Sequence, residues 1–315
     1  MRMKIFCMVV LCTCLFIACE KDNDDYEPVK PPVEQPEKPE KPTTPPLTDD
    51  IINVKIGDSN MIVGSNTWNA VAYGNNRFVA VGTSGYISYS LDGNSWSTPV
   101  QLASTNNVRV RFLNGKFFCC TTNVIYSSTD GINWEKTLER SREFTDIIYA
   151  DGKYMAITKE CERFYSDDAI NWTVGATEGY YGSKQTLCFG NGKFIMVGAR
   201  GQIRWTSDPW STAKWNVVSG SFKVWLSITF ANDKFVAVGE NGQVGFSTDG
   251  TTWKTKQVSS SAWCDVAYSN GKYIAVGNNG SYIISEDGEN WSDPEQVKEN
   301  GSIVTETLNG ICAVH

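Results

Sequence analysis

Five carboxylates and a single histidine decide which reactions this chain of 315 residues can support. Hydrolysis of a glycosidic bond uses two carboxylates held at a set separation. The candidates for such a pair are Glu160, Glu162, Glu240, Asp146 and Asp265. The only histidine is the terminal His315, which disfavours both a histidine-activated nucleophile and a histidine-containing zinc site. Because the sequence gives no distances between the carboxylates, it predicts no catalytic residue, no metal and no cofactor.

Another set of carboxylates recurs in a fixed context, of which Ser247-Thr248-Asp249-Gly250-Thr251-Thr252-Trp253 is the cleanest copy. The six copies pair Asp92 with Trp96, Asp130 with Trp134, Asp168 with Trp172, Asp208 with Trp215, Asp249 with Trp253, and Asp287 with Trp291. Asp-Gly between two strand-like runs predicts a tight hairpin turn, because glycine accepts a positive φ. The carboxylate can accept backbone N–H groups within its own turn. We therefore predict a structural rather than a catalytic role for these aspartates.

Two copies depart from this pattern. Ala169 replaces the glycine in the third copy, and Asp208-Pro209 opens a longer loop in the fourth. We expect both of these turns to differ in shape from the others.

A larger unit surrounds each copy and repeats about every 40 residues. Equivalent aromatic residues follow one another at steps of 37 to 41 residues: Phe78, Phe117, Tyr154, Phe194, Phe235 and Tyr273. Each unit contains four short strand-like segments, and one such sheet is too small to bury its own faces. The period therefore predicts an all-β fold, a β-propeller of four-stranded blades over residues 51–315.

The ends of the repeat region predict how the ring closes. After Trp291 the segment TETLNGICAV starts a further unit, and we expect the chain to stop after the second strand of that unit. Residues 54–63 precede the first full unit and align with an outer strand. We infer a seventh blade shared by the two termini, which leaves no free sheet edge. Six blades with loose terminal strands are the alternative.

The repeated motif carries a family resemblance. Ser-x-Asp-Gly-x-x-Trp is similar to the Asp-box (BNR) repeat of sialidase-like propellers, and the segments of the type VAYGNNRFVAVG resemble BNR-like and photosystem-assembly-factor-like propellers. The resemblance covers about residues 52–315. It implies a propeller fold, whereas propellers of these kinds include hydrolases, lectins and assembly factors, so it leaves the function open.

The N-terminal segment predicts export and anchoring. Residues 1–18 contain Arg2 and Lys4 followed by an apolar run, which is typical of a signal peptide. The ending LFIAC resembles the lipobox of bacterial lipoproteins, in which Cys19 is lipidated. Residues 19–50 contain that cysteine, an acidic stretch resembling the export tag of Bacteroidetes surface lipoproteins, and a proline-rich linker. We therefore expect a lipid-anchored protein of the outer membrane, exposed at the cell surface.

Six further cysteines are expected to be buried free thiols, because they lie mostly in apolar strand-like segments without the spacing of a disulfide framework. Adjacent Cys119 and Cys120 should lie on opposite faces of one strand.

The resemblance to sialidase-like folds implies a ligand-binding rim opposite the Asp-Gly turns. The residues that this assignment selects are Trp68, Phe144, Trp225 and Trp263 at the start of innermost strands, Tyr180 and Tyr181 in the longest loop between units, and Arg200 and Glu240 between second and third strands. Aromatic rings among polar groups suit a sugar, whose apolar face stacks on them. The alternative is that the three tryptophans pack between blades.

Together these observations predict a non-catalytic, surface-anchored propeller that binds a glycan or a surface or envelope protein. One alternative is a glycoside hydrolase or lyase of the sialidase-like group, although the Phe/Tyr-Arg-Ile-Pro segment of that group is missing. A second alternative is an assembly factor for an envelope complex. The net charge of −7 and the lack of a long basic patch disfavour nucleic acid as a partner. The membrane is expected to be contacted only through the lipid.

Overall fold

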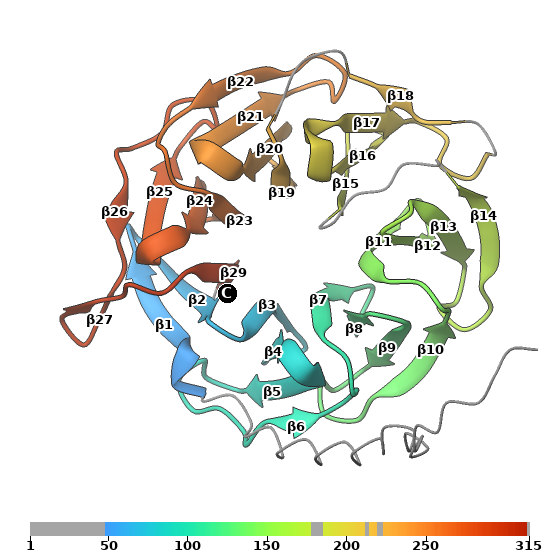
Figure 1. Cartoon of the computed structure of the whole chain (residues 1–315), viewed down its shortest axis with the longest axis horizontal. Helices are drawn as coiled ribbons and strands as arrows, with labels where there is room; N and C mark the ends of the chain where they lie inside the picture. The colour runs from blue at the N-terminus through green and yellow to red at the C-terminus, as the bar shows by residue number, and fades with distance from the viewer. Residues whose placement is uncertain (1–47, 178–184, 212–213, 219–222, 314–315) are drawn as a thin grey trace, which may run out of the picture. The chain divides into compact units, whose positions relative to one another are not determined.

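Seven antiparallel sheets form a ring in the computed structural model of the chain, which describes residues 48–177, 185–211, 214–218 and 223–313 (Figure 1). The prediction of a seven-bladed β-propeller is confirmed. The signal peptide, Cys19 and the linker lie outside the described residues, so the boundaries assigned to them stay predictions.

Six blades follow one another along the chain, each with its strands in sequence order from the ring axis outward. Blade 1 contains β3 (Trp68–Gly74), β4 (Arg77–Gly82), β5 (Tyr86–Ser90) and β6 (Val100–Gln101). Blade 2 contains β7 (Asn107–Leu113), β8 (Lys116–Thr121), β9 (Val124–Ser128) and β10 (Glu135–Glu139). Blade 3 contains β11 (Phe144–Ala150), β12 (Lys153–Thr158), β13 (Glu162–Ser166) and β14 (Thr173–Thr177).

The next three blades repeat this order. Blade 4 contains β15 (Thr186–Gly190), β16 (Lys193–Val197), β17 (Ile203–Thr206) and β18 (Asn216–Val217). Blade 5 contains β19 (Trp225–Ala231), β20 (Lys234–Gly239), β21 (Gln243–Ser247) and β22 (Lys254–Gln257). Blade 6 contains β23 (Trp263–Ser269), β24 (Lys272–Gly277), β25 (Ser281–Ser285) and β26 (Glu295–Gln296).

Blade 7 is built from both ends of the described chain, in the order β1 (Ile51–Ile56), β2 (Ser59–Ser65) and β29 (Leu308–Ala313). The shared blade is thus confirmed, but its composition differs from the expectation. The C-terminal segment supplies only the innermost strand, and β1 and β2 supply the third and second strands. Val63 of β2 pairs with Ile311 of β29, so backbone hydrogen bonds between the two ends close the ring.

The remaining short elements lie outside the regular blade pattern. The strands β27 (Lys298–Glu299) and β28 (Ser302–Ile303) form a hairpin between blades 6 and 7. The short 3-10 turns are η1 (Thr48–Asp50), η2 (Thr83–Gly85), η3 (Ala199–Gly201), η4 (Glu240–Gly242) and η5 (Asn278–Gly280).

The connections define two rims. The turns η2 to η5 join second to third strands, and because the strands are antiparallel they lie on the same rim as the loops between blades; we call this the η rim. The six turns that contain the repeated aspartates, which we call the Asp turns, join third to fourth strands on the opposite rim, which we call the Asp rim.

The core lies between blades rather than within them. Val79 and Val81 of blade 1 pack against Val110 and Phe117 of blade 2, and equivalent clusters fill the other blade junctions. Cys119 belongs to the cluster between blades 1 and 2, whereas Cys120 belongs to the cluster between blades 2 and 3. The prediction that these thiols lie on opposite faces is confirmed, and the six cysteines of the described residues are free.

A β-bulge occurs near the start of most innermost strands and determines which side chains reach the ring axis. The register shifts lie between Trp68 and Ala70, Asn107 and Arg109, Phe144 and Asp146, Trp225 and Ser227, and Trp263 and Asp265. A bulge inserts one unpaired residue and breaks the two-residue alternation of side chains. The direction of the first side chain therefore cannot be deduced from the later ones.

Candidate functional site

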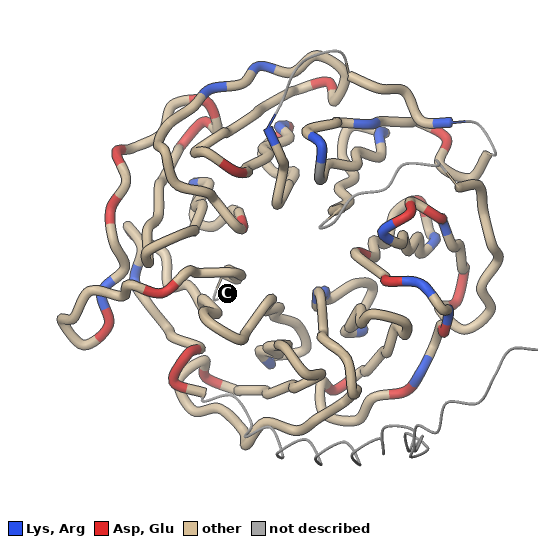
Figure 2. The backbone as a smooth tube through the Cα atoms, viewed as in Figure 1, with Lys and Arg blue, Asp and Glu red and all other residues tan. Residues whose placement is uncertain are grey.

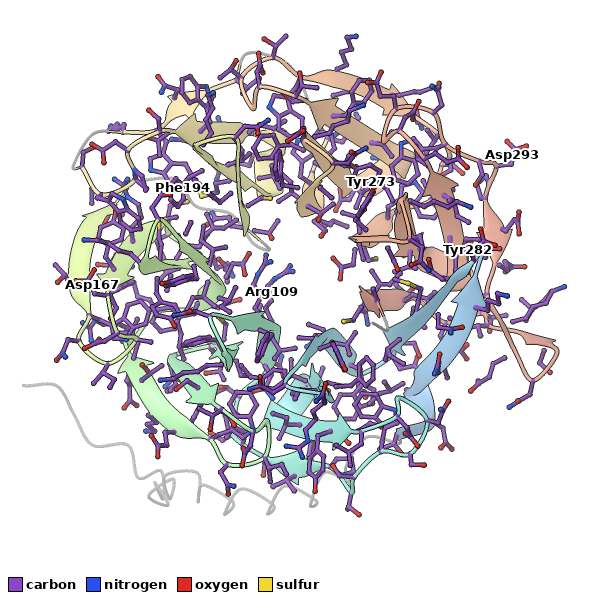
Figure 3. The ribbon with its side chains drawn as sticks, turned by 180° about the vertical axis from the view of Figure 1, so that it is seen from behind. Arg109, Asp167, Phe194, Tyr273, Tyr282 and Asp293 are labelled. Atoms are coloured by element: carbon purple, nitrogen blue, oxygen red, sulfur yellow. The ribbon has the colours of Figure 1, made fainter. Side chains whose placement is uncertain are left out.

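Equivalent positions of five innermost strands carry polar side chains around the ring axis. These side chains are Arg109, Asp146, Thr186, Ser227 and Asp265, from blades 2 to 6 in order. Figure 2 shows basic residues on β7 and an acidic residue on β23 at the inner edge of the ring, and Figure 3 shows Arg109 there. The two aspartates bind different groups, although the repeat places them at the same position.

Asp146 of blade 3 is fully buried and paired with arginine. Arg111 donates to both carboxylate oxygens at 2.6 Å, and the Nε of Arg109 lies 3.7 Å from Oδ1. The hydroxyl of Thr186 and the N–H of Leu187 also donate to Oδ2, each at 2.8 Å. Burial raises the pKa of Asp146, but the charges of the two arginines outweigh it, so the pKa is lowered overall. This carboxylate joins blades 2, 3 and 4.

Asp265 of blade 6 is partly exposed and has no ion pair within the described part of the chain. It accepts a hydrogen bond from the hydroxyl of Ser227 at 2.6 Å and from its neighbour's N–H, that of Val266, at 3.0 Å. The N–H of Ile311 donates to the other oxygen at 3.1 Å. Hydrogen bonds alone therefore hold this carboxylate between blades 5 and 7.

A cavity of about 300 Å³ opens on the η rim beside Asp265, and we call it the rim cavity. Its walls are Val224, Leu226, Glu240, Ala262, Cys264, Asn278, Thr307 and Asn309. They come from η4, η5 and the first residues of β19, β23 and β29, or the residues just before those strands. The predicted Glu240 lies here and is exposed, and the predicted Arg200 is exposed in η3 of the neighbouring blade.

Four of the predicted ligand residues do not reach any surface. Trp68, Phe144, Trp225 and Trp263 each have 0% of their surface exposed. Trp225 packs with Ile203 and Val197 of blade 4, which is the packing between blades considered as the alternative. The prediction that these four rings stack on a ligand is therefore wrong, because the bulge at each strand start places them in the core. Tyr180 and Tyr181 lie outside the described residues, so their assignment stays a prediction.

The repeated aspartates stabilise their own turns, as expected. In the fifth copy Ser247 donates to Oδ1 of Asp249 at 3.0 Å, and the N–H groups of Thr251 and Thr252 donate to the same oxygen at 2.7 Å. Trp253 then donates from Nε1 to the carbonyl of Gly250 at 3.1 Å. In the first copy the N–H groups of Ser95 and Asn94 lower the pKa of Asp92 to about 2.

The expectation that the third and fourth turns differ in shape is wrong for the third copy and confirmed for the fourth. Ala169 adopts a φ of +62°, and Asp168 accepts from Ile170 and Asn171 at 2.8 Å, so this turn has the shape of the others. The fourth turn does differ, because Pro209 follows Asp208 and the loop to Trp215 is longer. Thr206 replaces the serine there, and its hydroxyl accepts the N–H of Asp208 at 3.1 Å, as Ser90 does for Asp92 in the first copy.

The candidate catalytic carboxylates are mostly paired with cations. Glu160 and Glu162 lie 3.9 and 3.7 Å from Arg142, and Asp146 is held by Arg111. A general acid needs a raised pKa, whereas that of Asp146 is lowered. Only Glu240 and Asp265 lack an ion pair among the described residues.

The sequence also left three participants unassigned. Thr186 and Ser227 were recognisable only by aligning the position of Asp146 and Asp265 in every unit. Asn309 donates from its side-chain nitrogen to the carbonyls of Asn66 and Trp68, at 3.1 and 3.2 Å, and Asn69 binds the carbonyl of Asn107 in the same way. Asn69 and Asn309 each follow the first residue of an innermost strand, and this shared position was the sequence signal that could have identified them.

No group of three or more His, Cys, Asp or Glu side chains is placed to hold a metal ion within residues 48–313 as far as they are described. None of the helices in that part of the chain is long and apolar enough to cross a membrane.

Comparison with known proteins supports the class that the fold defines, a seven-bladed β-propeller. The family model of the DUF6242 beta propeller domain matches residues 56–180. No curated protein has a matching sequence. The Asp-box resemblance is not tested by these comparisons and stays a prediction.

The solved structures with a similar fold include two of YCF48. One is described as YCF48 bound to D1 peptide; it is 17% identical, has a TM-score of 0.61, and the match covers 85% of this chain and 97% of that chain. The other is YCF48 from Cyanidioschyzon merolae, at 17% identity and a TM-score of 0.59, with 82% of this chain and 96% of that chain covered. At this identity the likeness concerns the fold alone.

Proposed function

We propose that this protein is a non-catalytic propeller that binds an extended segment of a protein partner at the η rim, as an assembly factor does. The rim cavity carries the proposal: it is about 300 Å³ in volume, it opens beside the ring axis, and both polar and apolar side chains line it. A structurally similar propeller is described as bound to a peptide, which supports a protein segment as the ligand class.

A protein partner is favoured over a glycan because the described part of the η rim offers no aromatic platform at the predicted positions. Sugar recognition relies on exposed aromatic rings, and Trp68, Trp225 and Trp263 are fully buried. The walls of the rim cavity instead combine aliphatic and amide side chains with Glu240, Cys264 and Thr307, a mixture that suits a peptide backbone and its side chains.

A non-catalytic role is favoured by the state of the carboxylates. Glycoside hydrolysis requires a protonated acid beside an ionised partner. Asp146, Glu160 and Glu162 are engaged by arginines, which leaves Glu240 and Asp265 on the η rim side of blades 5 and 6. In this proposal those two act as binding groups.

The proposal includes the location predicted from the sequence. Lipidation at Cys19 and a proline-rich linker up to residue 50 hold the propeller at the outer membrane, exposed at the cell surface, where a protein of the cell envelope is the partner.

Site-specific photo-cross-linking tests the proposal. A benzophenone amino acid replaces Ala262 in the rim cavity. In the control variant it replaces Leu91, which lies beside Asp92 on the Asp rim and is 68% exposed. Irradiation of producing cells should link a discrete protein to the Ala262 variant and not to the Leu91 variant. Equal labelling from both positions, no labelling, or a product that carries only carbohydrate would contradict the proposal.

A further inference from the structure

We propose that the rim cavity binds the side chain of a lysine or arginine from the partner segment. This inference rests on the proposed function, because it names the chemistry that the protein segment brings to that site. It is carried by the hydrogen-bond acceptors of the cavity, by the unpaired acidic groups of blades 5 and 6, and by the position of the arginines near the ring axis.

Glu240 is the only acidic or basic side chain among the walls of the rim cavity. It is exposed, and no cation lies within ion-pair distance of it among the described residues. Lys223, which precedes Val224 in the chain, lines a separate cavity of about 470 Å³ with Lys256. The fixed charge of the rim cavity itself is therefore negative.

The amides of the rim cavity add acceptors. Asn309 uses its side-chain nitrogen for the carbonyls of Asn66 and Trp68, so its carbonyl oxygen remains as an acceptor. Among the described residues, the side-chain oxygen of Asn278 accepts a hydrogen bond only from the hydroxyl of Thr307, at 3.5 Å. Ammonium and guanidinium groups carry several donors and no acceptor, which matches this surplus of oxygen.

Asp265 extends the acidic character toward the ring axis, because it directly follows the cavity residue Cys264 in β23. Its oxygens receive hydrogen bonds from Ser227 and from two backbone N–H groups, and none from a cation. The two arginines of β7 already bind Asp146, with Arg111 at 2.6 Å from both of its oxygens. The charge of Asp265 also acts on Arg111, but no basic side chain lies within ion-pair distance of its oxygens among the described residues, so Asp265 adds negative charge on the side of blades 5 to 7.

The apolar walls suit the stem of such a side chain. Val224, Leu226 and Ala262 line the same cavity as Glu240. Lysine and arginine bury their methylene groups along apolar surface while their charged ends reach polar groups. A shorter ammonium or a bare metal ion would leave these walls without contact.

Peptide selection on the full-length chain in detergent tests this inference. A library of random twelve-residue peptides is panned against the chain, and single basic residues of the selected peptides are then replaced by methionine. Two receptor variants are compared: Glu240→Gln in the rim cavity and Glu286→Gln, an exposed glutamate in an Asp turn of blade 6. We expect selected peptides to share one lysine or arginine whose replacement weakens binding at least tenfold.

Glu240→Gln should weaken binding by a similar factor. When it is combined with the peptide substitution, the loss should be little larger than with either change alone. The control variant Glu286→Gln should bind as the parent does. Glu240→Lys should restore binding to a peptide in which the basic residue is glutamate. Peptides that bind without a basic residue, and that are blocked by Ala262→Trp but not by Glu240→Gln, would overturn this inference and leave the proposed function intact. Failure to select any peptide would overturn both.

Discussion

Blades 3 and 6 carry an aspartate at the same position of the innermost strand, yet the surroundings of the two carboxylates differ. Asp146 is fully buried and binds Arg111 through both oxygens, whereas Asp265 is partly exposed and is held by Ser227 and backbone N–H groups. Both aspartates accept the N–H of the following blade, from Leu187 and Ile311. The repeat therefore supplies the same backbone hydrogen bond to both aspartates. The residues on the neighbouring blades determine whether the carboxylate is also neutralised by a cation.

The difference separates a structural from a binding role within one repeat. A buried charge must be paired, and blade 2 provides Arg109 and Arg111 for it, so the charge of Asp146 is neutralised and the group as a whole is positive. Blade 5 instead provides the hydroxyl of Ser227, which donates a hydrogen bond to Asp265 but carries no charge that would neutralise it. A propeller with seven similar blades can thus be asymmetric in charge while remaining nearly symmetric in backbone.

The largest expected effect comes from breaking the ion pair. Asp146→Asn should lower the free energy of unfolding by about 3 kcal/mol, because it leaves the guanidinium of Arg111 without its counter-ion near the core. Asp265→Asn should cost only about 1 kcal/mol, because a neutral amide oxygen still accepts a hydrogen bond. Urea denaturation of both variants measures the difference.

A double substitution serves as the control. Asp146→Leu combined with Arg111→Met removes both charges and should recover most of the stability lost in Asp146→Asn. Equal losses in Asp146→Asn and Asp265→Asn, or no recovery in the double variant, would show that the two carboxylates are not distinguished by their partners.

A smaller effect is expected where the Asp turns of blades 3 and 6 differ. Gly288 of blade 6 has a φ of +74°, and a Cβ added there would lie 2.7 Å from Cγ2 of Val236 in blade 5. Gly288→Ala should therefore cost about 2 kcal/mol, from the left-handed backbone and from the clash together. Thermal unfolding followed by circular dichroism measures this loss. Asn290→Ala, an exposed change in the same turn, controls for disturbing the turn itself, and a loss as large there would point away from the clash.

The fold could be predicted because its determinants are local and repeated. The spacing of Phe78, Phe117 and their equivalents, together with the Asp-Gly turns, predicts six blades without any knowledge of long-range contacts, and the seventh was inferred from the terminal segments with six blades left as the alternative. The composition of blade 7 was predicted less well. The segment Leu308–Ala313 resembles both the first and the second strand of a unit in its apolar pattern, and only the pairing of β2 with β29 shows that it is the innermost strand.

The candidate site was predicted only in part. Glu240 was correctly placed on the η rim, since a connection between second and third strands has a fixed position in a propeller. The tryptophans were misassigned because a bulge follows Trp68, Trp225 and Trp263, and a bulge leaves no mark in the residue types of these strands. The different partners of Asp146 and Asp265 are Arg111 and Ser227, which lie about 35 positions away in the chain. No local sequence pattern connects residues that far apart.

The smallest expected effect sharpens the comparison between the turns. Ala169 adopts a φ of +62° in blade 3 where the other regular copies have glycine, and it is nevertheless buried. In blades 1, 2, 5 and 6 a Cβ at this position would collide with Ile62, Val79, Ile195 or Val236 of the preceding blade. For the turn of blade 3, the equivalent residue of the preceding blade is Phe118, which lies in one core cluster with Ala169 and whose ring is tilted by 50° against that of Tyr154. We infer that this flat ring leaves room for the methyl group.

Ala169→Gly should therefore change the free energy of unfolding by less than about 0.5 kcal/mol. Relief of the left-handed backbone is offset by the greater freedom of the unfolded chain and by the loss of a buried methyl group, each worth about 1 kcal/mol or less. The matched variant Phe118→Val should be destabilised by more when Ala169 is present than when it is glycine, because a branched side chain brings back the clash. Urea denaturation of the four combinations measures this coupling, and additive effects would show that Phe118 is not what permits alanine in this turn.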